Sequence, residues 1–132
     1  MMIFVDTSAF LAIFSVSDQN HLRAELCLRN LREERRILVT NNYVILESIA
    51  LLQKRFGLDK VRDFQIKLLP LIQIHWIDKD QHEAAIQVIF QENRRGLSLV
   101  DCAAFQTMRR LGIETVFTFD SHFREEGFKV IP

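Results

Sequence analysis

Four acidic residues occur at positions where their carboxylates could act together. Asp6 follows the apolar run IFV, and Asp120 ends the segment VFTFD. Glu47 lies within the apolar segment NNYVILESIALL, and Asp101 follows SLV. Carboxylate oxygens are the ligands that Mg²⁺ and Mn²⁺ prefer, so acids gathered at one place would form a divalent-metal site.

Three of these acids also have an ordinary structural explanation. Asp6 and Asp120 could each cap a following helix by accepting hydrogen bonds from its free N–H groups. Ser98 and Asp101 have the spacing of a capping box, with Asp in place of the usual Glu or Gln. For each of the three taken singly, the cap is the favoured explanation.

Glu47 is the acid that a cap cannot explain, because it lies in the middle of a predicted helix. Its neighbours one turn away are apolar, which predicts a side chain on a buried face: Tyr43, Val44, Ala50 and Leu51. No Lys or Arg stands one turn away. A buried ionised carboxylate is very costly unless it is paired, protonated or bound to a metal. Glu47 therefore indicates a cation shared with the other acids, and an ion pair with a distant arginine is the alternative.

The other residue types that bind metals form no motif. His21, His75 and His82 are expected to be ordinary surface or partly buried residues. His122, beside Asp120, could touch a substrate, although a role at the start of a helix is the simpler explanation. Cys27 and Cys102 lie in predicted helices among apolar neighbours and are expected to be small buried hydrophobes.

The elements that must position the acids follow from the apolar pattern. Short apolar runs predict strands at 2–5, 37–39, 72–77, 115–119 and 128–131, and helical spacing predicts helices at 7–14, 18–34, 43–56, 59–69, 78–95 and 98–111. Such alternation predicts an α/β protein, a three-layer α/β/α domain with a central parallel sheet and the first strand in its middle. Asp6 and Asp120 then meet at the carboxyl edge of the sheet. The helix that carries Asp101 starts at the same edge if it runs antiparallel to the strands.

Length and composition predict one compact domain over residues 1–132, with 48% hydrophobic residues and few Gly and Pro. No signal peptide or membrane span is expected, which favours a cytoplasmic protein. The net charge is zero, so any contact with nucleic acid must be local. Paired cations could supply a local patch, although most are expected to be solvated helix ends: Arg35-Arg36, Lys54-Arg55, Arg94-Arg95 and Arg109-Arg110.

The ordered set Asp6, Glu47, Asp101 and Asp120, with VDTSAF near the start and TFDSHF near the end, resembles the PIN domain. More narrowly, it resembles single-domain toxins of the VapC type. The resemblance covers essentially the whole chain. It implies a Mg²⁺- or Mn²⁺-dependent endoribonuclease that forms the toxin part of a type II toxin–antitoxin system. Such a toxin is usually a homodimer and is held inactive by a small cognate antitoxin.

The resemblance also assigns residues. The four acids would be catalytic, with Ser8, Ser98 and Thr118 as supporting hydroxyl residues. Asp6 and Asp101 would hold the metal, and Glu47 and Asp120 would complete its shell, directly or through water. The ion would neutralise charge on the attacked phosphate and lower the pKa of a bound water, with one ion or two left open. By analogy with the family, the products would carry a 5′-phosphate and a 3′-hydroxyl.

Other functions fit the sequence less well. A haloacid dehalogenase would normally carry a second acid two residues after Asp6, where Ser8 stands, and no Gly-x-Gly-x-x-Gly follows the first strand. A non-catalytic PIN-like module that binds RNA or protein is the strongest alternative, although it would have no need of four acids. Phe10, Phe14 and the helix at 59–69 are candidates for an antitoxin or dimer surface, and a broad cover for the sheet is the alternative.

Overall fold

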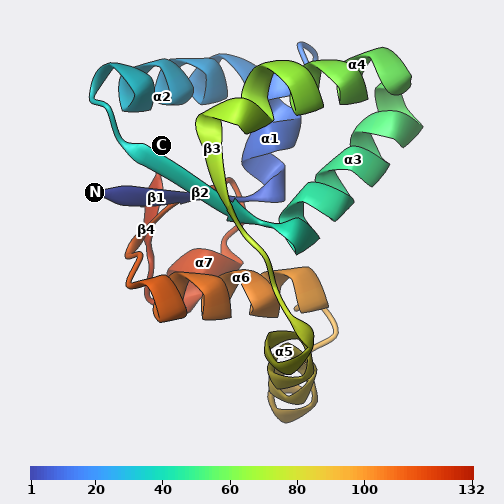
Figure 1. The fold of residues 1–132 in the computed structure, drawn as a ribbon, viewed down its shortest axis with the longest axis vertical. Coiled ribbons are helices and arrows are strands. Elements are labelled where there is room, and N and C mark those ends of the chain that lie inside the picture. The colour runs from blue at the N-terminus through green and yellow to red at the C-terminus, as the bar shows by residue number, and fades with distance from the viewer.

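The computed structural model describes residues 1–132 and is built on a parallel five-stranded sheet of order β3-β2-β1-β4-β5 (Figure 1). The strands are β1 (Met2–Val5), β2 (Ile37–Asn41), β3 (Ile72–His75), β4 (Thr115–Phe117) and β5 (Lys129–Ile131). The prediction that the first strand is central is confirmed. Its neighbours are β2 on one side and β4 on the other.

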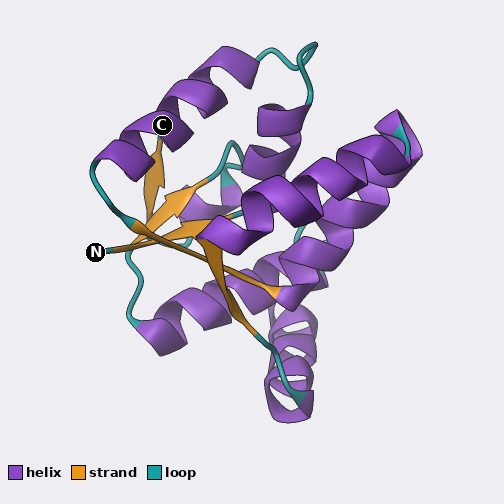
Figure 2. Cartoon of the chain, turned by 45° about the horizontal axis from the view of Figure 1, so that its top comes forward, coloured by secondary structure: helices purple, strands orange, loops and turns teal.

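Helices cover both faces of the sheet (Figure 2). They are α1 (Thr7–Phe14), α2 (His21–Glu33), α3 (Asn42–Phe56), α4 (Leu58–Asp63), α5 (Lys79–Glu92), α6 (Leu99–Leu111) and α7 (His122–Glu125). In Figure 1, α1, α2 and α4 lie above the sheet and α6 and α7 lie below it. The predicted three-layer α/β/α class is confirmed.

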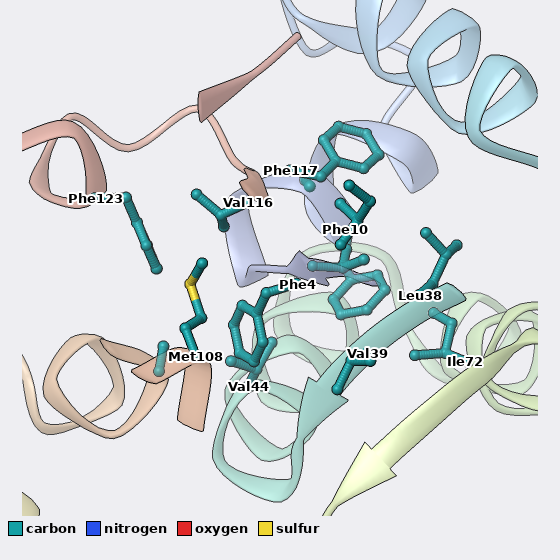
Figure 3. Packing of buried hydrophobic residues seen from close by; sticks show 14 of the residues in the cluster. Phe4, Phe10, Leu38, Val39, Val44, Ile72, Met108, Val116, Phe117 and Phe123 are labelled. Atoms are coloured by element: carbon teal, nitrogen blue, oxygen red, sulfur yellow. The ribbon is translucent and has the colours of Figure 1, made fainter. Parts of the chain in front are cut away.

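The core consists of two apolar layers, one on each face of the sheet. Phe4 aligns with Val39 on one neighbouring strand and with Val116 on the other, so these three side chains share a face. Figure 3 shows this layer against Met108 and Val44, whereas the opposite layer, with Phe117 and Leu38, faces Phe10. All of these side chains are buried. Burial on both faces explains why the strands read as continuous apolar runs.

β4 is two residues shorter than the predicted strand at 115–119, and the reason lies in its hydrogen bonds. The Thr118 N–H still donates to the Ile131 carbonyl, but the Phe119 N–H donates to Ser8 Oγ at 2.9 Å. The Asp120 N–H donates to Thr118 Oγ1 at 3.0 Å. Side-chain hydroxyls therefore replace the strand partner at the point where the acids begin.

The predicted helix at 59–69 does not continue as one regular α-helix. α4 is followed by a π-helical turn, η1 (Phe64–Leu68), and a 3₁₀ turn, η2 (Leu69–Leu71), before β3 begins. Pro70 has no N–H to continue the α-helical hydrogen bonding, and Leu69 donates back to the Phe64 carbonyl instead. The two changes of pitch end the helix within a few residues.

The proposed partner surfaces at Phe10 and Phe14 need correction. Phe10 is fully buried, and Phe14 is half-buried. Both rings pack edge-on against Phe64, at centroid distances of 5.0 and 5.9 Å. These aromatic residues therefore belong to the cover of the sheet.

None of the helices has both the length and the apolar character needed to span a lipid bilayer.

Asn41 joins three elements at the carboxyl edge of the sheet. Its Oδ1 accepts the Val44 N–H at 2.9 Å and so caps α3. Its Nδ2 donates to Thr107 Oγ1 at 3.1 Å, which ties α3 to α6. The side chain is completely buried. α3 carries Glu47 and α6 carries Asp101, so this amide sets the relative position of two predicted site helices.

Replacing Asn41 with Ala should therefore destabilise the fold. The variant loses the cap and the bond to α6, and the free energy of unfolding should fall by about 3 kcal/mol. Urea unfolding followed by circular dichroism measures the difference. The exposed Asn30→Ala on α2 is the matched control and should change little. Equal midpoints for the two variants would contradict this role of Asn41.

Candidate active site

Asp6 lies at the end of β1, and its carboxylate is buried. The residue is 4% exposed and occupies the cap position of α1, yet its side chain makes no cap hydrogen bond. Instead its Oδ2 accepts hydrogen bonds from Thr118 Oγ1 at 3.0 Å and from Ser8 Oγ at 3.3 Å. The helix-cap explanation for this side chain is therefore wrong. The parallel pairing of β1 with β4 brings Thr118 to Asp6 across 112 residues of sequence.

Ser8 and Thr118 hold Asp6 and the chain that leads to Asp120. Their oxygens lie 3.0 Å apart, and each also accepts a backbone N–H from the segment after β4. A hydroxyl that accepts a backbone N–H has its own proton free to donate toward the carboxylate. The two hydroxyls thus fix the orientation of Asp6 and the path of the chain to Asp120.

Asp101 and Asp120 converge with His122 at the same edge. One potential ligand atom from each of the three lies within 4.8 Å of the others. His122 Nδ1 is 3.2 Å from Asp120 Oδ1 and 3.4 Å from Asp101 Oδ2, in a geometry that forms no hydrogen bond. α6 runs back beneath the sheet, so its first turn lies where β1 and β4 end (Figure 1).

The local explanations for Asp101 and Asp120 hold as well. The Ser98 N–H donates to Asp101 Oδ2, and the Asp101 N–H donates to Ser98 Oγ, both at 3.1 Å. This is the predicted capping box. Asp120 Oδ1 accepts the backbone N–H of His122 at 2.9 Å. Capping and convergence are therefore not alternatives here, because the capping bonds are what hold the two carboxylates in place.

The charges of the three aspartates influence one another's pKa, although Asp6 is not one of the three residues whose ligand atoms lie within 4.8 Å of one another. Burial raises the pKa of Asp6 to about 7, a bond from the Thr7 amide and one from Thr118 lower it, and the charges of Asp101 and Asp120 raise it. Burial also raises the pKa of Asp101, and the charge of Asp120 adds to that rise. Carboxylates that repel one another in a buried place fit a divalent cation, and hard oxygen donors fit Mg²⁺ or Mn²⁺. The residues present therefore suit the metal that the resemblance implies.

Glu47 does not lie where its apolar neighbours predicted. It is half-buried, and Ala50 and Leu46 beside it are exposed, so the expected burial is wrong. The buried face of α3 is narrower than the sequence suggested, because α3 packs between α1 and α6 and its outer side is exposed to solvent. Glu47 forms no salt bridge, and it is not among the atoms that lie within 4.8 Å of one another.

Of the other residues considered in the sequence, some contact the acids and some do not. Ser98 contacts Asp101 and thereby joins the site. Cys27 and Cys102 are buried free thiols as expected, and burial raises the pKa of each to about 11, which makes them unreactive. His122 begins α7, as the simpler explanation expects, and its ring also lies against two of the acids. Its adjacency to Asp120 was the available signal, whereas the contact with Asp101 depends on the packing of α6 against α7.

A comparison with family models decides what kind of protein carries this site. The PIN domain model matches residues 3–129. This chain belongs to the PIN-domain family. The family resemblance predicted from the four acids is therefore confirmed, and the divalent-metal chemistry that its site suggests is that of PIN nucleases.

Named relatives narrow the family to the VapC type. The 23S rRNA-specific endonuclease VapC20 of Mycobacterium tuberculosis, from strains CDC 1551 / Oshkosh and H37Rv, is 31% identical over 128 residues, covering 96% of this chain and 95% of the relative. The crystal structure of M. tuberculosis VapC20, described as a Sarcin-Ricin loop cleaving toxin, matches with a TM-score of 0.84 at 30% identity, covering 98% of this chain and 99% of that one. The predicted enzyme class, a VapC-type endoribonuclease, agrees with these relatives.

A more distant structure supports the fold alone. FitAcB from Neisseria gonorrhoeae matches with a TM-score of 0.72 at 15% identity, covering 100% of this chain and 97% of that chain. The PIN architecture is thus retained where most side chains differ.

The raised pKa of Asp6 predicts how pH affects stability. A folded pKa of about 7 against 3.8 means that the folded state binds the proton more tightly, so ionisation of Asp6 destabilises the metal-free protein as pH rises. The penalty is absent below the unfolded pKa and complete above the folded one. At about 1.36 kcal/mol per pH unit it reaches up to about 4 kcal/mol.

The variant Asp6→Asn should therefore be more stable than the parent protein in EDTA at about pH 8 and nearly equal to it at about pH 4. Thermal unfolding across this pH range measures the difference. The exposed Asp59→Asn serves as control and should follow the parent at every pH. A destabilised Asp6→Asn at high pH would show that the ionised carboxylate contributes favourably to the fold.

Proposed function

We propose that this PIN-domain protein is a Mg²⁺-dependent endoribonuclease and the toxin of a VapBC-type toxin–antitoxin pair. The observation that carries the proposal is the buried carboxylate of Asp6, whose pKa is raised by its burial and, to a smaller extent, by the charges of Asp101 and Asp120. A set of acids that repel one another has no structural benefit, which argues against the non-catalytic alternative. The match to an rRNA endonuclease over nearly the whole chain supports the same conclusion.

The metal would be held by Asp6, Asp101 and Asp120, with Mn²⁺ as an alternative ion. When bound, the ion would neutralise charge that develops on the attacked phosphate and make water a better nucleophile at neutral pH. Glu47, half-buried on the second turn of α3, would reach the site through water. This assignment gives Asp120 a closer role than the sequence suggested.

The chain's other residues orient these acids. Ser8 and Thr118 hold the Asp6 carboxylate, and Ser98 holds Asp101. The His122 backbone N–H holds Asp120 Oδ1, and its ring contacts both neighbouring carboxylates. These bonds all come from the chain itself, and by fixing the carboxylates they would preorganise the site for a cation.

The relatives suggest the partners. VapC20 is named as an endonuclease specific for 23S rRNA, so we propose structured ribosomal RNA as the substrate class here. A small cognate antitoxin and a homodimer of this single PIN domain, spanning residues 1–132, complete the proposal. The antitoxin would have to be removed before activity is measured, because a bound inhibitor would mask cleavage.

Replacing one of the proposed metal-binding acids should strongly reduce cleavage while the fold survives. Asp101→Asn and Asp120→Asn should each reduce the single-turnover cleavage rate by about a hundredfold or more, because each removes charge placed for the transition state. The substrate is a Sarcin-Ricin loop fragment of 23S rRNA, tested in Mg²⁺ and then in EDTA. Circular dichroism confirms that each variant is folded.

The control is Asp59→Asn, whose side chain is 97% exposed, and which should cleave like the parent. Cleavage by the parent protein in EDTA would contradict the metal requirement. Full activity in a folded Asp101→Asn or Asp120→Asn variant would remove that residue from the mechanism.

A further inference from the structure

A second cavity lies directly beside the acids. Its volume is about 200 Å³, and residues that line it include Arg23, Thr118, Phe119, Asp120, Ser121 and Arg124. Thr118 and Asp120 belong to the candidate site itself, so the two places are continuous. The cavity brings together α2, the segment after β4 and α7, which are far apart in sequence.

The cavity is cationic where the neighbouring site is anionic. Arg23 and Arg124 form no salt bridge, unlike Arg36, Arg94 and Arg109, which are each paired with a glutamate. Three of the paired cations that the sequence offered as an RNA patch are thus neutralised. In a chain of zero net charge, two unneutralised guanidinium groups beside the acids are a local source of attraction for an anion.

Arg23 is held at the wall of the cavity. Its guanidinium lies over the Phe119 ring at 5.5 Å from the centroid, and its Nη1 is 3.4 Å from Asn20 Oδ1. Phe119 is fixed in turn, because its N–H donates to Ser8. The aromatic contact uses the face of the guanidinium and leaves most of its edge donors free for an oxygen ligand.

We propose that this cavity binds an RNA phosphate adjacent to the one that is cleaved, with Arg23 and Arg124 as its cationic partners. The proposal rests on the proposed nuclease function and adds a substrate subsite to it. Guanidinium groups match phosphate oxygens in charge and geometry. A volume of about 200 Å³ is below the range of about 300–1,000 Å³ for drug-sized ligands, which suits one phosphate with its sugar.

An RNA strand fits this arrangement better than an acidic peptide does. Asp120 and its neighbouring acids repel any anion that enters the cavity, and a peptide carboxylate would meet that repulsion with no other contact to offset it. An RNA strand held at the acids carries its next phosphate on the same chain. Binding of the first phosphate therefore holds the second one near the cavity, and little additional entropy is lost when the second one binds.

The test compares two double variants with the same change in charge. Arg23→Gln with Arg124→Gln removes the cavity cations, whereas Arg29→Gln with Arg110→Gln removes exposed cations from α2 and α6 outside it. The probe is a fluorescein-labelled RNA hairpin with the Sarcin-Ricin loop sequence, and binding is followed by fluorescence anisotropy with Ca²⁺ in place of Mg²⁺, so that the acids hold an oxygen-binding ion. Arg124→Gln alone provides a second variant, because Arg124 forms no salt bridge or side-chain hydrogen bond.

We expect the cavity variant to raise the Kd for the RNA about tenfold, equivalent to about 1.4 kcal/mol. The slope of log K against log salt should fall by about 0.7, since one phosphate contact on a single strand is lost and each contributes about 0.7. Arg124→Gln alone should show about half of that change in slope. The exposed-cation control should change the Kd by less than about twofold.

Three results would overturn the subsite. These are an unchanged Kd in the cavity variants, an equal loss in the control, or normal RNA binding together with lost binding of a polyglutamate peptide. Cleavage by the parent protein in Mg²⁺ is measured separately. Metal-dependent cleavage with an unchanged Kd rejects the subsite alone. A raised Kd in the cavity variants, in a protein that never cleaves, rejects the nuclease function alone.

Discussion

The carboxylate of Asp6 constrains much of this structure, because it is buried at the end of the central strand with only hydroxyl groups and one backbone amide to stabilise it. Thr118 and Ser8 donate to a single oxygen, and no cation of the chain pairs with it. The effect of burial on the pKa of Asp6 is therefore larger than the effect of its hydrogen bonds, and the pKa rises to about 7. A group in this state destabilises the metal-free fold, and the cost is explained if the site exists to hold a cation.

The parallel topology of the sheet brings the acids together without additional loop residues. Adjacent parallel strands end at the same edge, so β1 delivers Asp6 and β4 leads to Asp120 without a dedicated loop. α6 returns antiparallel and delivers Asp101 on its first turn, where a capping box fixes the carboxylate. Asn41 then links the helices of Asp101 and Glu47. The same hydrogen bonds that end strands and begin helices thereby position the acids.

Much of the fold and of the candidate site could be predicted from the sequence, because residues that end strands and begin helices are also residues of the site. β1 and α1 have the predicted bounds, and α6 begins after Ser98 with the expected capping box. Local signals failed where long-range packing decides. The prediction of β4 was two residues too long, because nothing in its own apolar run shows that Ser8 will take the Phe119 N–H.

Glu47 shows a different kind of error. Its apolar neighbours predicted a buried carboxylate, yet the buried acid is Asp6, and Glu47 is half exposed. The argument from the cost of burying a charge was sound but was applied to the wrong residue, because helical spacing cannot show how wide the covered face will be. The prediction for Phe10 was wrong in the opposite sense, because Phe10 was expected at a partner surface and is buried. Its neighbour Phe64 is far away in the sequence, so the contact could not be predicted.

The central claim is that Asp6, Asp101 and Asp120 form one divalent-cation site, and calorimetric titration of the metal-free protein with Mn²⁺ tests it most directly. The account predicts saturable binding in the parent and in Asp59→Asn, and about tenfold or greater weakening in Asp6→Asn and Asp101→Asn. Mn²⁺ binding of equal affinity in all four proteins, or none in the parent, would contradict it.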